Sequence, residues 1–166
     1  MCLIVKKENF EIKVAEKDIK CFKIVDKIDV STFRSMYLNF TYKCQNYKAI
    51  GFSEVVTNDL ENVRRVGFAD DVGYSLYSPD LLCALKKAYR RKKFDEYYCF
   101  GYGGFHSYRE LSKCDVYGTG FIGVECIIPK GSRYIEGIDA TDDKKAYFSE
   151  EITIVREINF GNQSIR

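Results

Sequence analysis

Apolar residues alternate with polar ones along much of this chain, and the alternation predicts β-strands. In residues 18–27 the apolar side chains fall on both faces of an extended chain, which predicts a strand covered on both sides. Residues 120–128 form the most apolar run and are rich in β-branched side chains, so they predict a central strand. Shorter strands are predicted over 133–137 and 152–158, with an exposed polar loop over 139–145 between them.

Two weaker patterns lie in the first quarter of the chain. Apolar residues alternate with charged ones over 6–20, which predicts a half-buried strand or an extended arm. Over 31–42, turn-forming residues give way to aromatic alternation, and Arg34 and Ser35 lie where the loop gives way to the strand. An arginine there can hold a phosphate or a carboxylate in its planar fork, or can pair with a surface acid.

One main amphipathic helix is predicted after Ser78. Ser78 suits the N-cap, Pro79 the first helical position, and Asp80 the positive end of the helix dipole. Apolar residues at helical spacing then form a buried stripe, and basic residues over 86–93 suit the negative end. A short second helix is predicted over 109–114.

Composition places these elements in a single globular domain. The chain has 166 residues, of which 46% are apolar and 30% charged, enough for one domain with a real core. We therefore predict an α+β fold in one domain spanning residues 1–166, with a frayed tail at about 161–166.

The net charge, the apolar runs and the cysteine spacing exclude several classes of partner. With 26 basic and 24 acidic residues the net charge is +2, so no nucleic-acid partner is expected. No apolar run approaches a membrane span or a signal peptide, which predicts a cytoplasmic protein with reduced thiols and no membrane contact. Seven widely spaced cysteines and one histidine argue against a metal site. Removal of Met1 would make Cys2 an N-terminal nucleophile, although a small apolar residue that opens the first strand is the favoured interpretation.

Residues 97–108 are the most distinctive stretch. They hold six aromatic residues, three glycines and the only histidine, His106. The pattern predicts a buried strand that runs into a tight turn and sets His106 at a cleft. The alternative is a histidine that makes only structural hydrogen bonds.

Three later segments carry a resemblance to known proteins: Gly104-Phe105-His106-Ser107-Tyr108, residues 125–135 with Ile-Pro-Lys-Gly, and residues 148–154 with Ser-Glu-Glu. Together with the Met-Cys-Leu start, they resemble small uncharacterised proteins of bacteria and their phages. The last two segments also resemble the closing part of ADP-ribosyltransferase-fold domains.

The resemblance implies a split, mostly antiparallel sheet with a cleft for NAD or another ADP-ribose-type nucleotide. Glu150 or Glu151 would then correspond to the family's catalytic glutamate. The chain lacks the family's Ser-Thr-Ser and His-Gly-Thr motifs, and its two glutamates are adjacent, which favours binding over catalysis. If the protein is an enzyme, an ADP-ribosyltransferase or NAD glycohydrolase activity is implied. The candidate ligand-binding residues are Arg34, Ser35, Tyr37, His106, Tyr108, Arg133 and Tyr134.

Three functional hypotheses follow. The first is a nucleotide-binding domain of this family's shape, and the second is a phage-type sponge that sequesters a host nucleotide immune signal as a homo-oligomer without turning it over. The third is a protein–protein interaction module that covers its partner with exposed Tyr and Phe side chains.

Overall fold

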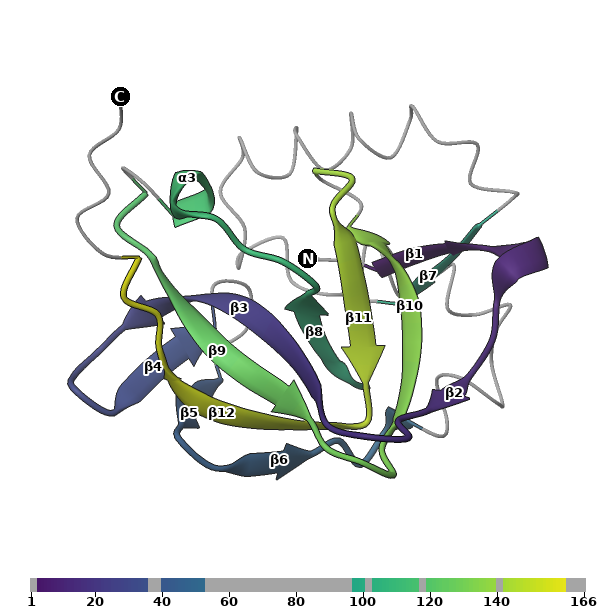
Figure 1. Cartoon of the computed structure of the whole chain (residues 1–166), viewed down its shortest axis with the longest axis horizontal. Coiled ribbons are helices and arrows are strands. Elements are labelled where there is room, and N and C mark those ends of the chain that lie inside the picture. Colours follow the sequence, from purple (N-terminus) through teal and green to yellow (C-terminus); the bar gives the residue numbers. More distant parts are fainter. Residues whose placement is uncertain are drawn as a thin grey trace, which may run out of the picture.

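The protein is built around one antiparallel β-sheet (Figure 1). The computed structural model describes residues 3–35, 40–52, 97–100, 103–116, 119–139 and 142–160. Within these residues, twelve strands join in a single hydrogen-bonded sheet, and neighbouring strands pair antiparallel throughout.

The sheet has two halves. The first half is centred on β3 (Ile19–Lys27) and β9 (Ile122–Ile128), which pair along seven residues. Its other strands are β12 (Glu151–Glu157), β6 (Asn46–Lys48), β4 (Thr32–Ser35) and β5 (Thr41–Lys43). The second half runs in the order β8 (Phe105–Tyr108), β11 (Lys145–Ser149), β10 (Arg133–Asp139), β1 (Leu3–Lys6) and β7 (Tyr97–Phe100), with β2 (Lys13–Val14) on β10.

In the described part of the chain, a narrow junction joins the two halves of the sheet. Strand β3 pairs with β8 at one position, where Phe22 lies opposite Tyr108. The buried Lys23 of β3 adds a second link, because its ammonium group donates a hydrogen bond to the backbone carbonyl of His106. Side chains from both halves nevertheless meet in one core, since Tyr147 of β11 packs with residues of β3, β9 and β12.

Two clusters of buried side chains form the core. The first gathers residues of β3, β9 and β12 and includes Tyr147 from β11. The second lies against the second half of the sheet and includes Leu3, Phe100 and Phe148. Strand β11 therefore supplies side chains to both clusters, Tyr147 to the first and Phe148 to the second.

Phe148 is the centre of the second cluster. Its ring is fully buried and lies 5.5 Å from the ring of Phe52, 5.4 Å from Phe100 and 5.0 Å from His106. Gly104 makes room for it, because a Cβ atom at that position would lie 2.5 Å from the Phe148 ring. The glycine-rich turn before β8 thus permits close aromatic packing.

The structure confirms several predicted strands and corrects the fold class. The predicted segments 18–27, 120–128 and 152–158 correspond to β3, β9 and β12 within two residues at each end. However, strands account for 56% of the described residues and helical residues for 8%, so the class is mostly antiparallel β and not α+β with a main helix. The main helix predicted after Ser78 lies outside the described residues.

The second predicted helix is also corrected. It was expected over 109–114, whereas α3 spans Lys113–Val116 and is one turn long. The reason is the cap: the Asp115 carboxylate accepts hydrogen bonds from the backbone N–H of Ser112 at 2.8 Å and from its hydroxyl at 3.0 Å. These two hydrogen bonds from Ser112 to Asp115 cap the helix, which therefore begins directly after Ser112. The other helical element is the 3-10 turn η1 (Lys7–Asn9), and no described helix has the length and apolar character needed to span a membrane.

We predict that Phe148→Ala lowers the free energy of unfolding by about 3–5 kcal/mol, because it removes a fully buried ring and leaves a cavity. Phe40→Ala is the matched control, since Phe40 is 39% exposed and should cost much less. Urea titration of both variants measures the difference. Equal losses would show that Phe148 does not have the central role assigned to it.

Candidate functional site

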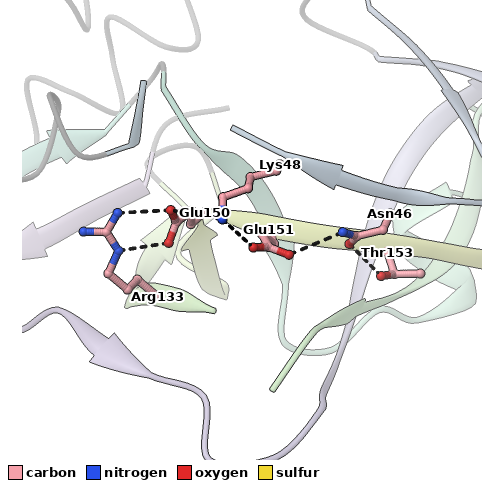
Figure 2. A network of polar contacts seen from close by, with 6 residues as sticks. All are labelled: Asn46, Lys48, Arg133, Glu150, Glu151 and Thr153. Atoms are coloured by element: carbon pink, nitrogen blue, oxygen red, sulfur yellow. Dashed lines mark hydrogen bonds and ion pairs between the residues drawn. The ribbon is translucent and has the colours of Figure 1, made fainter. Parts of the chain in front are cut away.

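The two candidate catalytic glutamates are held in ion pairs (Figure 2). Glu150, between β11 and β12, accepts hydrogen bonds on both carboxylate oxygens from the Arg133 guanidinium, at 2.9 and 3.1 Å. The Arg133 contact also lowers the pKa of Glu150, so this carboxylate stays ionised in mildly acidic solution. Figure 2 shows the two planar groups facing each other in the fork geometry that makes such pairs strong.

Glu151 points to a different set of partners. Its carboxylate lies 3.0 Å from the Lys48 ammonium and accepts a hydrogen bond from the Asn46 amide at 3.3 Å. The Thr153 hydroxyl donates a hydrogen bond to the side-chain oxygen of Asn46 at 2.9 Å, which completes a row of polar contacts between β6 and β12 (Figure 2). These contacts connect strands, so the structure gives both glutamates a role in joining β10, β11, β12 and β6.

The candidate ligand residues near the N-terminus lie on another part of the sheet. Arg34 is on β4 and pairs with Asp26 of β3, the surface-acid alternative considered from the sequence. Ser35 ends the same strand, and Tyr37 lies outside the described residues. Strand β4 pairs with β3 and β5, whereas Arg133 and Tyr134 are on β10, which pairs with β11, β1 and β2.

His106 is a partly buried residue of β8 whose ring is turned into the protein. Both of its ring nitrogens are buried and make no well-formed hydrogen bond with the described residues, although a backbone group of Phe100 interacts with the ring, and the ring packs edge-on to Phe148. Burial lowers the pKa of His106 well below its usual value, because the charged imidazolium would lose its hydration, and the nearby Lys23 charge acts in the same direction. Tyr108 on the same strand is also buried, with the Lys144 ammonium 5.9 Å from its ring centre. These positions suit packing in the interior.

A groove of about 470 Å³ lies elsewhere, on the second half of the sheet. It is bordered by strands β1, β7, β10 and β11 and by the segment that leads into β2. The residues that line it are Ile4, Val5, Lys6, Asn9, Glu11, Lys13, Tyr97, Arg109, Glu136, Gly137, Ile138, Lys145, Ala146 and Tyr147.

Strand alternation builds the floor of this groove. In β1, Leu3 and Val5 point into the second core cluster, so Ile4 and Lys6 are left on the opposite face. In β11, Ala146 and Phe148 point into that cluster and leave Lys145 and Tyr147 on the same opposite face. The pairings Ile4–Ile138, Ile138–Lys145 and Glu136–Tyr147 then set these residues side by side.

The segment of residues 9–14, which we call the arm, borders the groove. Phe10 and Ile12 pack against the second core cluster, and the residues between and beside them line the groove: Asn9, Glu11 and Lys13. Lys13 is held in place by Glu136 of β10, with 2.8 Å between the ammonium nitrogen and a carboxylate oxygen. The hydrogen bond to Glu136 raises the pKa of Lys13, so this pair remains charged across the neutral range.

The charges of the groove are unequal. It contains four cationic side chains and two carboxylates, and the Lys13–Glu136 pair neutralises one of each. Within the part of the chain that the structure describes, Arg109 and Lys145 have no carboxylate at ion-pair distance, and Lys6 has only the exposed Glu8 at 3.7 Å. The backbone N–H of Arg109 donates to the carbonyl of Lys145 at 3.0 Å, which sets these two residues next to each other in the backbone.

Tyr147 lies at the boundary between the groove and the first core cluster. It belongs to the first core cluster and also lines the groove, so the groove begins where the cluster ends. Burial raises the pKa of Tyr147, while the nearby Arg109 charge acts in the opposite direction. Its ring packs edge-on to Tyr134 at 5.9 Å.

Sequence reasoning missed this site. The available signal was the alternation of Phe10, Ile12 and Val14 with charged residues over 6–20. Phe10 and Ile12 do pack against the second core cluster, whereas Val14 is 58% exposed. Among the described residues, no three His, Cys, Asp or Glu side chains are arranged to hold a metal ion. Comparisons with protein-family models, with curated proteins and with solved structures gave no match, so the function must be argued from the chemistry of the groove.

We predict that stability depends on the ionisation of His106, the only histidine in the chain. Its pKa is depressed in the folded state, so below its usual value of 6.5 the unfolded chain binds a proton that the folded chain does not. The free energy of unfolding should therefore fall as pH drops below 6.5, with a limiting slope of about 1.4 kcal/mol per pH unit.

Urea titrations at intervals between about pH 7 and pH 5 measure this slope, a range in which carboxylates contribute little. His106→Phe is the comparison, because it keeps a ring in the core but removes the ionisable group. The same slope in both proteins would show that His106 is not the residue responsible.

A second prediction concerns the Arg133–Glu150 pair. Glu150→Gln should lower the free energy of unfolding at pH 7 by about 1–2 kcal/mol, because Arg133 loses a bidentate, partly buried charged partner. Glu151→Gln is the matched control and should cost less, since its partner Lys48 is exposed. In the unsubstituted protein, the pKa of Glu150 is lower in the folded chain than the usual value of 4.5. The stability that the ionised carboxylate contributes should therefore be lost as the pH falls from 4.5 through this lowered pKa. Urea titration at pH 7 and at acidic pH checks both statements, and a larger loss for Glu151→Gln would contradict them.

Proposed function

We propose that the groove between β11 and the arm binds a nucleotide through its phosphate groups and that the protein does not transform it. The observation that carries this proposal is the excess of cations around Arg109 and Lys145 on a protein whose net charge is only +2. A local excess on a nearly neutral chain favours an anionic ligand at one place. It does not favour general attraction to polyanions.

The two adjacent cations suit a phosphate in particular. Arginine presents a planar fork of N–H donors, which matches two phosphate oxygens, and lysine adds a mobile point charge. Because Arg109 and Lys145 are fixed next to each other by the backbone hydrogen bond between them, both can contact one phosphate group. Lys6 lines the same groove and can contact a further phosphate.

The remaining features suit the nucleoside part. A volume of about 470 Å³ is within the range of small-molecule sites, roughly 300–1,000 Å³. Tyr97 lines the groove from β7 and Tyr147 lines it from β11, and aromatic rings bind nucleotide bases by stacking or edge contacts. Ile4 and Ile138 add an apolar floor.

The lining residues favour binding without catalysis. Among the described residues of the groove there is no Ser, Thr, Cys or His, and hence no nucleophile–base pair of the kind that covalent catalysis uses. Glu136 is paired with Lys13. The arrangement therefore supports retention of an intact nucleotide, which is the chemistry of a sequestering protein, and NAD and ADP-ribose-type nucleotides belong among the ligands to be tested.

The test is calorimetric titration with AMP, ADP, ATP, NAD and ADP-ribose. We expect binding of at least one of these, and Arg109→Gln or Lys145→Gln should weaken it about tenfold or more, because each removes a charged hydrogen bond worth about 1.5–3 kcal/mol. Lys17→Gln is the matched control, since Lys17 is exposed and outside the groove, and should leave the affinity unchanged.

Recovery of the ligand separates binding from catalysis. After prolonged incubation and heat denaturation, the ligand should be recovered intact and in stoichiometric amount. Steady release of products would instead favour an enzyme. If no nucleotide bound, or if Arg109→Gln and Lys145→Gln bound as well as the unsubstituted protein, the groove would not be the site.

A further inference from the structure

The arm carries a chemical feature that phosphate binding does not explain. Glu11 lines the groove and, in the described part of the chain, has no ion-pair partner. A carboxylate in a groove that binds anions weakens the attraction for phosphate. Its presence is understandable if it contacts a different part of the ligand, one that offers hydrogen-bond donors.

The register of the strands separates Glu11 from the phosphate-binding cations. Lys145 lies opposite Ile138 on β10, and Glu136 lies two residues further along that strand, about 7 Å away at the usual rise of a strand. Lys13 of the arm reaches Glu136, so the arm borders the far part of the groove. A nucleotide with its phosphate at Arg109 and Lys145 would thus direct its base towards the arm.

Hydrogen-bond chemistry then selects the base. An ionised carboxylate only accepts hydrogen bonds, and its two oxygens suit two parallel N–H donors. Guanine offers such a pair on its Watson–Crick edge, the N1–H and the N2 amino group. Adenine and cytosine each present one amino donor beside a ring nitrogen acceptor, and uracil presents one N–H between two carbonyl acceptors. An acceptor placed against a carboxylate oxygen is repelled.

A second residue of the arm, Asn9, has side-chain chemistry that suits guanine. Asn9, the last residue of η1, lines the groove two positions before Glu11. Its amide can both donate and accept, so it can contact the O6 carbonyl of a guanine whose N1–H and N2 group face Glu11. Tyr97 on β7 lines the groove as well and offers a ring to the base.

We propose that the groove is selective for guanine nucleotides, with Glu11 as the specificity-determining residue. This inference rests on the nucleotide binding proposed above and adds the identity of the base. Adenine nucleotides, including NAD and ADP-ribose, should bind through the same cations but less tightly.

The test compares GDP, IDP and ADP by calorimetric titration on the full chain. Inosine differs from guanosine only by the missing N2 amino group, so IDP isolates one of the two donors. We expect GDP to bind about tenfold tighter than ADP, in the range usual for a bidentate contact to a base, and IDP to bind less tightly than GDP.

The substitution Glu11→Gln tests the residue itself. Glutamine presents one donor and one acceptor, which match the edge of adenine better than that of guanine, so the ratio of the GDP and ADP affinities should fall to about one or below. Glu16→Gln is the matched control, because Glu16 is exposed and outside the groove, and the ratio should persist.

The outcomes distinguish the two proposals. Equal affinity for GDP and ADP in the unsubstituted protein would overturn guanine selectivity and leave nucleotide binding intact. A guanine preference that survives Glu11→Gln would overturn the role of Glu11. Absence of binding for all three nucleotides would overturn the proposed function and this inference together.

Discussion

The structure depends on one strand that is buried on both faces. In β11, Ala146 and Phe148 point into one core cluster and Tyr147 into the other, and the strand pairs with β8 on one side and β10 on the other. A shift of one residue would exchange the two faces, placing Tyr147 where Phe148 packs against Gly104. The register is therefore fixed by packing, and the same register sets Lys145 and Tyr147 at the groove.

Local alternation was enough to predict some of these strands. Strands β3, β9 and β12 are long apolar runs, so their existence and approximate ends follow from periodicity alone. The order of the second half does not, because it brings residues 3–6 between residues 97–100 and 133–139. The α+β class was wrong because strands make up most of the described residues, and many of these strands are short and carry weak periodicity one at a time.

Local sequence patterns were also insufficient to predict the candidate site. From the sequence, Arg34 and Arg133 were plausible ligand contacts and Glu150 a plausible catalytic residue, and in the structure all three pair with other charged residues. Whether a charge is paired depends on which strands are neighbours, and this is a long-range property. Arg109 and Lys145 gained their importance only when the backbone hydrogen bond between them set two cations beside an open groove. His106 had the opposite outcome, since the aromatic packing that made its segment distinctive also buried its ring nitrogens.

The arrangement of charge in the groove bears on specificity as well as affinity. A groove that only captured anions would be best served by cations alone, yet this one contains the Lys13–Glu136 pair and the carboxylate of Glu11. The pair can be explained by structure, because it attaches the arm to β10. Glu11 has no such partner among the described residues, and its neighbours in sequence, Phe10 and Ile12, already anchor the arm to the core. An unpaired acceptor in a cationic groove reduces the affinity for every phosphate, and it favours a ligand only if that ligand offers donors in return. Discrimination between bases is the benefit that can offset this cost, and under the proposed function the arm, and not the cations, would therefore select the base.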